Sequence, residues 1–512
     1  MNQTSPIRFP WIVILGISLS FFLASYDTTA FNLALVSIQN DLQLSLSQLD
    51  WVMTSMMIAL GTFLVPGGKI SDKYGHKYPM IIGLITFSLV SVLGGFAQNA
   101  PQLISMRILQ GATAALFWPG MQAISLYAVK ESKRTLAVGV SQFAGALGIA
   151  TGPLLSGILL NYLSWRWVFW TTVPVALLSL VIIAIFIPDK AFEQHKKKKI
   201  DLASVFFLCG AAFSLIHALD LLGRYGFVNQ QSLTWCAISV VLFWFFIVRD
   251  DNIREPLIDF EILKNKQFVS GVLVRIMAAT SYFSFLFLTG FALQQIALLS
   301  AEESSFYFLP LTIGLMIFSL IAGWLGRYFS VKNLMFIGLF GLGVACLSYG
   351  ILLQFSLDYW VLTTPLALMG IFFGIMGPTN TVFTIGSLPK SLTATGAGVL
   401  TMLLMIFGSV GIVIASIFIR FFGTRLTLSS LKTSEISLSS VQESLVEQTI
   451  TGMIPIKQAM VRFGEHAEAV YLALRKSFFQ AMGLDLYLLA GMIFLTFAIL
   501  VPLHYKKVKS QL

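Results

Sequence analysis

Apolar segments of about 20 residues recur along the whole of this 512-residue chain. A helix of that length spans the hydrocarbon core of a bilayer, which is about 30 Å thick. Strands of a membrane barrel would be about half as long and would alternate apolar with polar residues. Hydrophobic residues make up 57% of the chain and charged residues 11%, whereas soluble domains carry about 25% charged residues. The sequence therefore predicts an all-α integral membrane protein and excludes a soluble enzyme.

The apolar segments divide into a group of six, a pair and a second group of six. The predicted domains are a six-helix bundle in residues 1–190, two linker helices with a basic loop in 191–262, and a second six-helix bundle in 263–512. The second bundle includes an extracytoplasmic loop at 423–480. The total is about 14 transmembrane helices. The predicted spans are Trp11–Val36, Gln48–Gly68, Tyr78–Ala97, Pro101–Ala128, Thr135–Leu160, Trp165–Ile187, Leu202–Leu222, Leu233–Val248, Phe268–Leu299, Ser305–Gly326, Asn333–Leu353, Tyr359–Ile385, Ala394–Phe422 and Ala481–Leu503.

Basic residues gather in alternate loops, for example in Lys69–Lys77 and in Lys196–Lys199. The intervening loops carry almost none, and Gln39–Asp50 is acidic. Because basic loops stay on the cytoplasmic side, we expect both termini in the cytoplasm and the protein in the cytoplasmic (inner) membrane. The net charge of +10 then reflects contact with anionic lipid and indicates no nucleic-acid partner.

No cofactor motif is visible in the sequence. Cys209, Cys236 and Cys346 are isolated in apolar segments, without the spacing of a metal site or a disulfide framework. A GxxxxGK[ST] phosphate loop is absent, and no nucleophile with a matching base can be picked out. We therefore expect a protein that is not an enzyme, binds no metal or other cofactor, and does not use ATP as its energy source.

Asp27 is the first candidate for function, because it lies within an otherwise apolar predicted span. An ionised carboxylate at the centre of a bilayer costs about 2.5 to 3.5 kcal/mol, so it calls for a partner, a water-filled cavity or a bound proton. Removal from water favours the protonated form of a carboxyl group. The alternative is a position near the outer end of the helix, about 24 Å from Trp11, from which the side chain reaches the interface.

Other polar side chains also fall inside predicted spans. Gln294 and Gln295 lie in an otherwise apolar helix and are candidates for lining a cavity. His217 and Asp220, near the end of a linker helix, are expected to have an interface or structural role. Arg275 lies within about 12 Å of its helix start, so its side chain is expected to reach the cytoplasmic surface.

The segment Gly68–Lys77, GKISDKYGHK, lies between the second and third predicted helices. Glycines permit a sharp turn there, and an acid among bases can form ion pairs that break and re-form as two bundles move. A fainter copy, Gly323–Lys332, follows the second helix of the second bundle. Such repeats are typical of transporters that rock two halves about a midplane site. The residues expected to form this conformational latch are Gly68, Asp72, Lys73, Gly75, Lys77 and Arg134.

This segment closely resembles the signature of the major facilitator superfamily between helices two and three, with His76 at one of the basic positions. A second resemblance, in helix four, is to the family motif whose buried arginine is associated with proton transfer. A lone arginine in the membrane needs an acid, a carbonyl group or water nearby, and Asp27 is the expected partner. A fixed hydrogen bond to the backbone is the alternative. The matching residues are Arg107, Gln110, Gly111 and Pro119.

The fifth helix resembles the motif associated with the antiporters of this family. Its glycines let neighbouring helices approach closely and its proline permits bending. The resemblance implies a helix that tunes the conformational switch and limits leak, and generic close packing is the alternative. The matching residues are Gly148, Gly152, Pro153 and Gly157, with Ser156 in place of a usual glycine.

The first helix resembles the motif of the fourteen-helix drug:proton antiporter branch. The usual proline after Leu35 is replaced by Val36. The segment Trp165–Pro174 matches the same branch, where an asparagine is usual at Thr172. The matching residues of the first helix are Asp27, Thr28 or Thr29, Asn32, Ala34 and Leu35.

The resemblance implies an antiporter that is driven by the proton gradient and exports hydrophobic or amphiphilic compounds, with cationic ones favoured, by alternating access. The compound itself stays open, because the branch also exports bile salts, fatty acids and other amphiphiles. Asp27 and Arg107 are expected to couple transport to protons. Two alternatives stay open: a proton-coupled symporter or importer of a metabolite on the same fold, and a transport-dead sensor or scaffold. The residues expected to line the substrate cavity are Asp27, Asn32, Gln110, Gln294 and Gln295.

The expected partners are the small hydrophobic substrate, protons and membrane lipid. Within the loop 423–480, residues 454–474 carry apolar side chains at helical spacing, so one or two helices are expected on the outer face. This segment either docks a periplasmic adaptor and outer-membrane channel or merely covers the protein.

Overall fold

The computed structural model describes residues 7–505, apart from residues 45, 190–200, 226–228, 254–255, 259, 300, 355–358, 435, 437, 452–453 and 455. Every element within these residues is a helix. The predicted all-α fold class is therefore confirmed.

The first half is a bundle of helices that begins with α1. Pro10 at the start of α1 suits that position, because its φ is fixed near the helical value and its missing N–H is not needed there. Asn99 caps α4 by accepting a hydrogen bond from the backbone N–H of Gln102 at 3.0 Å. The helices are α1 (Pro10–Leu42), α2 (Leu46–Tyr74), α3 (Lys77–Gly94), α4 (Ala100–Tyr127), α5 (Arg134–Tyr162), and the short α6 (Arg166–Trp170) and α7 (Thr172–Phe186), which share one span.

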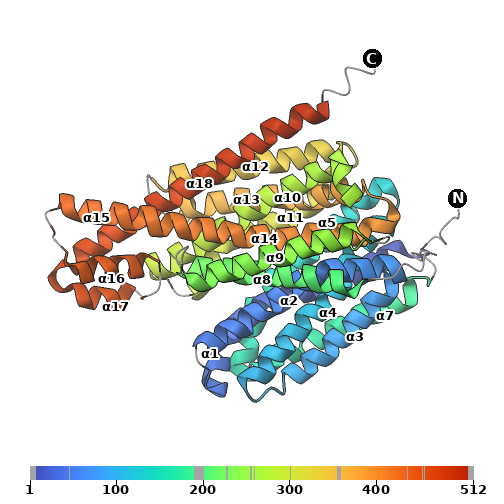
Figure 1. Ribbon diagram of the computed structural model, residues 1–512, viewed down its shortest axis with the longest axis horizontal. Helices are drawn as coiled ribbons and strands as arrows, with labels where there is room; N and C mark the ends of the chain where they lie inside the picture. Colours follow the sequence, from blue (N-terminus) through green and yellow to red (C-terminus); the bar gives the residue numbers. More distant parts are fainter. Residues whose placement is uncertain are drawn as a thin grey trace.

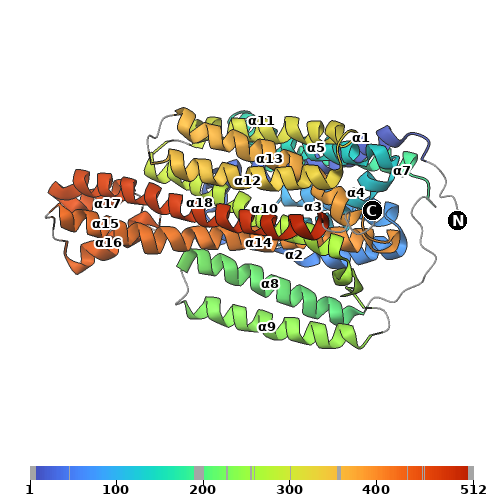
Figure 2. The same cartoon turned by 90° about the horizontal axis from the view of Figure 1, so that it is seen from above.

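Two further helices, α8 (Leu202–Tyr225) and α9 (Gln230–Asp251), lie side by side along the bundle (Figure 2). α8 packs against α2 and α14, and α9 packs against α8. His217 of α8 lies 5.3 Å from Trp51 and 5.1 Å from Trp235, measured between ring centroids. This aromatic packing agrees with an interface role for His217, whereas the side chain of Asp220 lies outside the described residues.

The second half contains the remaining long helices and a helical segment that projects beyond them. In Figure 1, α15–α17 lie at one end of the molecule, while the start of α1 and the end of α18 lie at the other. The helices are α10 (Lys266–Phe291), α11 (Ala301–Leu325), α12 (Val331–Leu352), α13 (Tyr359–Ile385), α14 (Thr393–Phe418), α15 (Thr424–Thr433), α16 (Ser440–Ile450), α17 (Ile456–Phe463) and α18 (Ala467–Tyr505).

Within the residues that the structure describes, thirteen helices are long and apolar enough to cross a membrane. α4 is not among these thirteen, because Arg107, Gln110 and Gln122 make it less apolar, but it packs against α2 and α3 inside the first half. With α4 included, the chain is a multi-pass membrane protein that matches the prediction of about 14 helices.

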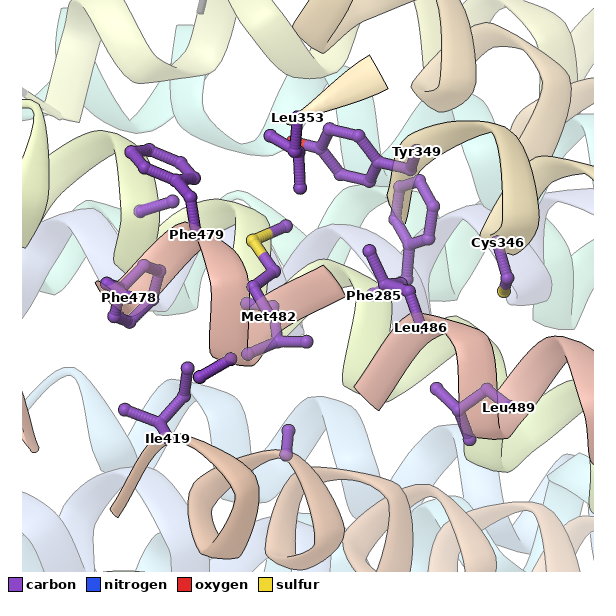
Figure 3. Packing of buried hydrophobic residues seen from close by; sticks show 14 of the residues in the cluster. Phe285, Cys346, Tyr349, Leu353, Ile419, Phe478, Phe479, Met482, Leu486 and Leu489 are labelled. Carbon is purple, nitrogen blue, oxygen red and sulfur yellow. The ribbon is translucent and has the colours of Figure 1, made fainter. Parts of the chain in front are cut away.

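Each half has its own hydrophobic core. Figure 3 shows part of the core of the second half, where Phe285 and Tyr349 lie with ring centroids 4.9 Å apart beside Leu486 of α18. A second cluster, which includes Leu84 and Phe117 of the first half, also reaches Val399 and Met402 of α14. The two halves are therefore joined by apolar contacts as well as packed internally.

Contacts between the halves repeat in a crosswise manner. Near one end, Gly68 and Leu64 of α2 lie against Ala394 and Gly398 of α14. In the same way, Gly323 and Ser319 of α11 lie against Leu136 and Gly139 of α5. The second helix of each half therefore packs on the fifth helix of the other half. This arrangement gives the repeat at 68 and 323 a physical reason, because a glycine is needed where each pair of backbones meets.

The structure corrects the predicted turn at Gly68. α2 continues to Tyr74, so Gly68 lies within the helix, and a Cβ there would collide with the backbone of Ala394. The turn comes later, at Gly75, whose φ of 82° lies in the left-handed region that glycine adopts at little cost.

Replacing Gly398 with a larger residue should open the end of the molecule where α2 meets α14. A Cβ on Gly398 would lie 2.6 Å from the carbonyl oxygen of Leu64, so Gly398→Val must push the two helices apart. Ser319 is fully buried where α11 meets α5, the second contact between the halves at this end. Labelling of Ser319→Cys by a maleimide, in a background without the native cysteines, therefore reports this opening. We expect Gly398→Val to raise the labelling rate several-fold.

Gly491→Val is the matched control, because no atom lies within 4 Å of a Cβ at that glycine. It should leave the labelling rate unchanged. If Ser319→Cys is labelled at the same rate with Gly398 and with Gly398→Val, the assignment of this contact is contradicted.

Candidate functional site

An ion pair between Asp27 of α1 and Arg107 of α4 lies inside the first half. Arg107 Nη1 donates to Asp27 Oδ2 at 2.8 Å, and both side chains are buried. The same Nη1 donates to Gln110 Oε1 at 3.0 Å, and Gln110 Nε2 donates to the hydroxyl of Ser91 at 2.9 Å. The pairing of Arg107 with Asp27 is the one predicted from the sequence, and a bond from Arg107 to the backbone, the alternative, is not seen in the described residues.

The ion pair leaves hydrogen-bonding capacity unused. Asp27 Oδ1 and Arg107 Nε are buried and have no hydrogen-bond partner among the described residues. The guanidinium of Arg107 lies 4.1 Å from the centre of the Phe31 ring, which gives it a second, weaker contact. Burying two charges is expensive unless all their bonding groups are satisfied. This pair is therefore buried with part of its hydrogen-bonding capacity unsatisfied.

Glycines of α5 bring that helix against the part of α1 that carries Asp27. A Cβ at Gly148 would meet the backbone of Phe22 and Tyr26, and one at Gly152 would meet Thr29. The hydroxyl of Thr29 also donates to the carbonyl oxygen of Gly148 at 3.5 Å. Gly157 is half-buried, and the side chain of Pro153 lies outside the described residues. Close packing on α1 is thus established for Gly148 and Gly152, and their role in the switch stays a prediction.

A cavity of about 540 Å³ lies between the halves, on the side where α15–α17 project. Thirteen of its twenty lining residues are apolar, with contributions from α1, α2, α8, α10 and α14. This volume and lining suit a drug-sized apolar molecule. Its polar lining residues are Thr28, Thr54, Arg107, Ser409, Ser416, Arg420 and Thr451.

The structure corrects the predicted lining of the cavity. Asp27 is fully buried behind Arg107 and does not itself line the space, because its carboxylate is turned toward the guanidinium. Gln110 is occupied by Arg107 and Ser91, and the exposed Gln294 is not one of the residues that line this cavity. The side chains of Asn32 and Gln295 lie outside the described residues.

Helices of the outer segment close over this cavity. Thr451, at the end of α16, is one of its lining residues, and Arg420 Nε lies 3.5 Å from Glu447 Oε1 of α16. The predicted helices at 454–474 are present as α17 and the start of α18. The end of α16 thus reaches the cavity, while covering of the protein and docking of an adaptor both stay predictions.

Asp72 joins the halves at the opposite end. Its carboxylate accepts hydrogen bonds from the backbone N–H groups of Ala394 and Thr395, at 2.9 and 2.6 Å, and from the Thr395 hydroxyl at 2.6 Å. These groups form the first turn of α14, where unpaired N–H groups and the helix dipole favour an anion. The predicted latch is present at Asp72, but its partner is a helix N-terminus and not a basic side chain.

The basic latch residues make contacts within the first half. Lys73 lies over the Tyr74 ring, and Lys77 pairs with Asp189 at 2.6 Å. Arg134 lies 3.5 Å from Glu131 and stacks on Tyr127. The expected latch of Asp72, Lys73 and Arg134 is therefore not joined by ion pairs among the described residues in this conformation, and the ion pair of Arg134 is local. The basic side chains instead contact acids and aromatic rings that lie close by, as is usual for charges on the same or a neighbouring helix.

His76, which occupies a basic position of the motif, is neutral here. Its side chain is buried, and its Nδ1 lies 2.9 Å from the Ser71 hydroxyl. Burial lowers the pKa of His76 to about 4, because the charged form would have to leave water. This histidine therefore contributes packing to the turn between α2 and α3, and not a positive charge.

Two polar contacts of buried side chains were not anticipated from the sequence. Gln122 Nε2 of α4 donates to the Thr401 hydroxyl of α14 at 2.8 Å, which links the halves. The Ser284 hydroxyl donates to Asp485 Oδ2 at 2.7 Å inside the second half. Asp485 lies in a predicted apolar span, so the rule that singled out Asp27 could also have found it.

Comparison with known proteins identifies relatives of this chain. The family model of the Major Facilitator Superfamily matches residues 17–412. The tetracenomycin C resistance and export protein of Streptomyces glaucescens is 29% identical over 60% of this chain and 57% of its own length. Multidrug resistance protein 3 of Bacillus subtilis is 30% identical over 66% of each chain. The aligned part thus spans less than two thirds of either relative.

A solved structure shares the fold. The human organic anion transporter MFSD10 superposes with a TM-score of 0.60 and 14% identity, covering 97% of this chain and all of that one. At this identity the likeness shows the common architecture of the helices and says nothing about the cargo.

The neutral state of His76 predicts a pH dependence of stability. The pKa of His76 is about 4 in the folded protein and about 6.5 in an unfolded chain. Between these values the unfolded state binds more protons, so stability is lost as the pH falls from about 6.5 toward 4, by at most about 1.4 kcal/mol per pH unit. When the pH is lowered from 7.5 to 5 in neutral detergent, the melting temperature should therefore fall more for the native protein than for His76→Gln.

The exposed His466 supplies the control for this experiment. His466→Gln should keep the pH dependence of the native protein. An equal fall in melting temperature for the native protein and His76→Gln would contradict the buried, neutral state of His76.

Proposed function

The chain belongs to the Major Facilitator Superfamily, and we propose that it exports hydrophobic or amphiphilic compounds across the cytoplasmic membrane in exchange for protons. Membership of this family makes it a transporter and not an enzyme. The resistance and export functions named for its relatives support the direction of transport.

The observation that carries this proposal is the Asp27–Arg107 pair at the wall of an apolar cavity. Arg107 lines the cavity, and Asp27 lies directly behind it at 2.8 Å. A proton on Asp27 would remove the negative charge that holds Arg107 in place. Cargo in the cavity and a proton on Asp27 would therefore influence each other through Arg107.

The proposed cycle couples this exchange to the movement of the halves. In the conformation described here, Asp72 holds α14, and the glycine contacts of α2 with α14 and of α5 with α11 close one end. The larger cavity lies toward the other end. Release of cargo outward, protonation of Asp27 and breaking of the Asp72 contacts would then let the halves rock to the inward-open form.

The cavity lining favours an apolar cargo over a sugar or a small hydrophilic metabolite. A site for such a solute would present several hydrogen-bonding side chains, whereas most of this lining is aliphatic or aromatic. This contrast makes the importer alternative the weaker one. We place the protein in the cytoplasmic membrane with both termini inside, as its basic loops predict.

The experiment that tests the proposal measures export in everted membrane vesicles from a host without its own drug pumps. Tetracenomycin C, ethidium and the neutral dye phenylnaphthylamine serve as probes. Vesicles with the native protein should accumulate at least one probe when the lumen is acidified, and an ionophore that collapses the pH gradient should stop accumulation. Asp27→Asn should lower the rate by about tenfold or more, because its side chain cannot take up or release a proton.

Asp41→Asn is the matched control. Asp41 also pairs with an arginine, Arg166 at 2.7 Å, but its side chain is 45% exposed and lies outside the membrane-spanning part of α1. This variant should retain most of the transport rate at equal protein levels. Undiminished, gradient-dependent accumulation in Asp27→Asn vesicles would overturn the assignment of the proton to Asp27.

A further inference from the structure

A second, smaller cavity of about 190 Å³ lies between the halves, nearer the end closed by Asp72. α1 contributes Phe21 and Ser25 to this space, whereas it contributes Thr28 and Phe31 to the larger cavity. From α14, Thr401 lines it about 12 Å from the helix start. Asp27 thus lies in the turn of α1 that separates the two cavities.

Arg275 of α10 lines this smaller cavity and has no ionic partner. Its side chain is only 6% exposed, so it does not reach the cytoplasmic surface as the sequence predicted. In the part of the chain that the structure describes, no acid lies within ion-pair distance of its guanidinium, and its Nε is a buried donor without an acceptor. By contrast, Arg107 in the same membrane region has Asp27.

Two further polar groups of this cavity lack partners. Gln122 Oε1 and Trp118 Nε1 are buried and make no hydrogen bond among the described residues, although Gln122 Nε2 is held by Thr401 at 2.8 Å. Gln142 also lines the space. The smaller cavity is therefore lined by one guanidinium and by further polar groups without hydrogen-bond partners in the described part of the chain, and these residues come from both halves.

A buried, unpaired guanidinium is unfavourable unless water or an anion satisfies it. Its planar set of donors fits a carboxylate or sulfonate through two parallel hydrogen bonds. We propose that this cavity, centred on Arg275, binds the anionic head group of an exported amphiphile. The proposal rests on the proposed export function, and it departs from the cationic cargo that the sequence favoured.

The position of the cavity gives it a place in the transport cycle. The Gln122–Thr401 bond and the Asp72 contacts with α14 close it in this conformation. When the halves rock, the same contacts separate and Arg275 becomes accessible from the cytoplasm. The head group then binds first at Arg275, and the apolar body extends toward the larger, apolar cavity.

A pair of dyes with the same aromatic body tests this selectivity. Anilinonaphthalene sulfonate carries an anionic group, and phenylnaphthylamine does not. The purified protein is reconstituted in phosphatidylcholine vesicles, which supply no net anionic lipid head group, and uptake is driven by an acidic lumen. Arg275→Gln should lower sulfonate transport by about tenfold or more, because a charge-assisted hydrogen bond to the sulfonate is lost. The same variant should change phenylnaphthylamine transport by less than about twofold.

Two variants separate charge recognition from structural damage. Arg275→Lys keeps the charge without the planar fork, so it should recover part of the sulfonate transport. Arg462→Gln, at an exposed position on α17, should change neither rate. Equal loss of both dyes in Arg275→Gln would assign Arg275 a structural role and overturn the proposal. Transport of phenylnaphthylamine but not of the sulfonate by the native protein would also overturn it.

A binding measurement distinguishes failure of this proposal from failure of the export function. Naphthoate should raise the melting temperature of the purified native protein in neutral detergent, and Arg275→Gln should abolish that rise. Naphthylmethanol, which has no charge, should affect both proteins equally. If neither dye is transported but naphthoate binds through Arg275, the export proposal fails and the anion site stands. If naphthoate gives no Arg275-dependent rise, the anion site fails.

Discussion

The ion pair of Asp27 with Arg107 is the interaction on which the rest of this molecule depends. Two charges are held 2.8 Å apart inside a membrane bundle, where neither would be stable alone. Gln110 and Ser91 form hydrogen bonds that hold the arginine, and the glycines of α5 let that helix pack closely on the part of α1 that carries Asp27. Since one oxygen of Asp27 and one nitrogen of Arg107 remain unpaired, the pair is stable but not fully satisfied. The proton exchange that we propose at Asp27 would act on this incompletely satisfied pair.

The contacts between the halves provide the second element of a switch. Glycine pairs bring α2 against α14 and α5 against α11 by the same crosswise rule. Among the described residues, the first of these interfaces carries a buried carboxylate on a helix N-terminus, whereas Arg327, just beyond the end of α11, occupies the position that corresponds to Asp72. The closed end is therefore held by packing on both sides and by a polar contact on one. The hydrogen bonds of Asp72 are lost when the helices separate by a short distance. A contact that is either made or broken in this way suits a movement between two states.

The sequence predicts much of this architecture, because hydrophobic length and loop charge are local properties. The spans, the central pair of helices and the partnership of Asp27 with Arg107 follow from the cost of placing charge in lipid. Side-chain direction is not a local property, and here the predictions fail. Gln110 and Gln294 are polar in apolar helices, but whether they face a cavity depends on the rotation of each helix against its neighbours. Asp72 likewise finds backbone N–H groups more than 300 residues away, a partner without a sequence signature.

Infrared difference spectroscopy of the purified protein tests the central claim most directly, because it detects a protonated carboxyl group. Asp485→Asn serves as the background, since Asp485 is another buried acid. The account predicts a carboxyl band on acidification that Asp27→Asn removes, and whose intensity falls when an exported compound is added. A band that is absent at every pH at which the protein is folded, or that is insensitive to both Asp27→Asn and the compound, would contradict it.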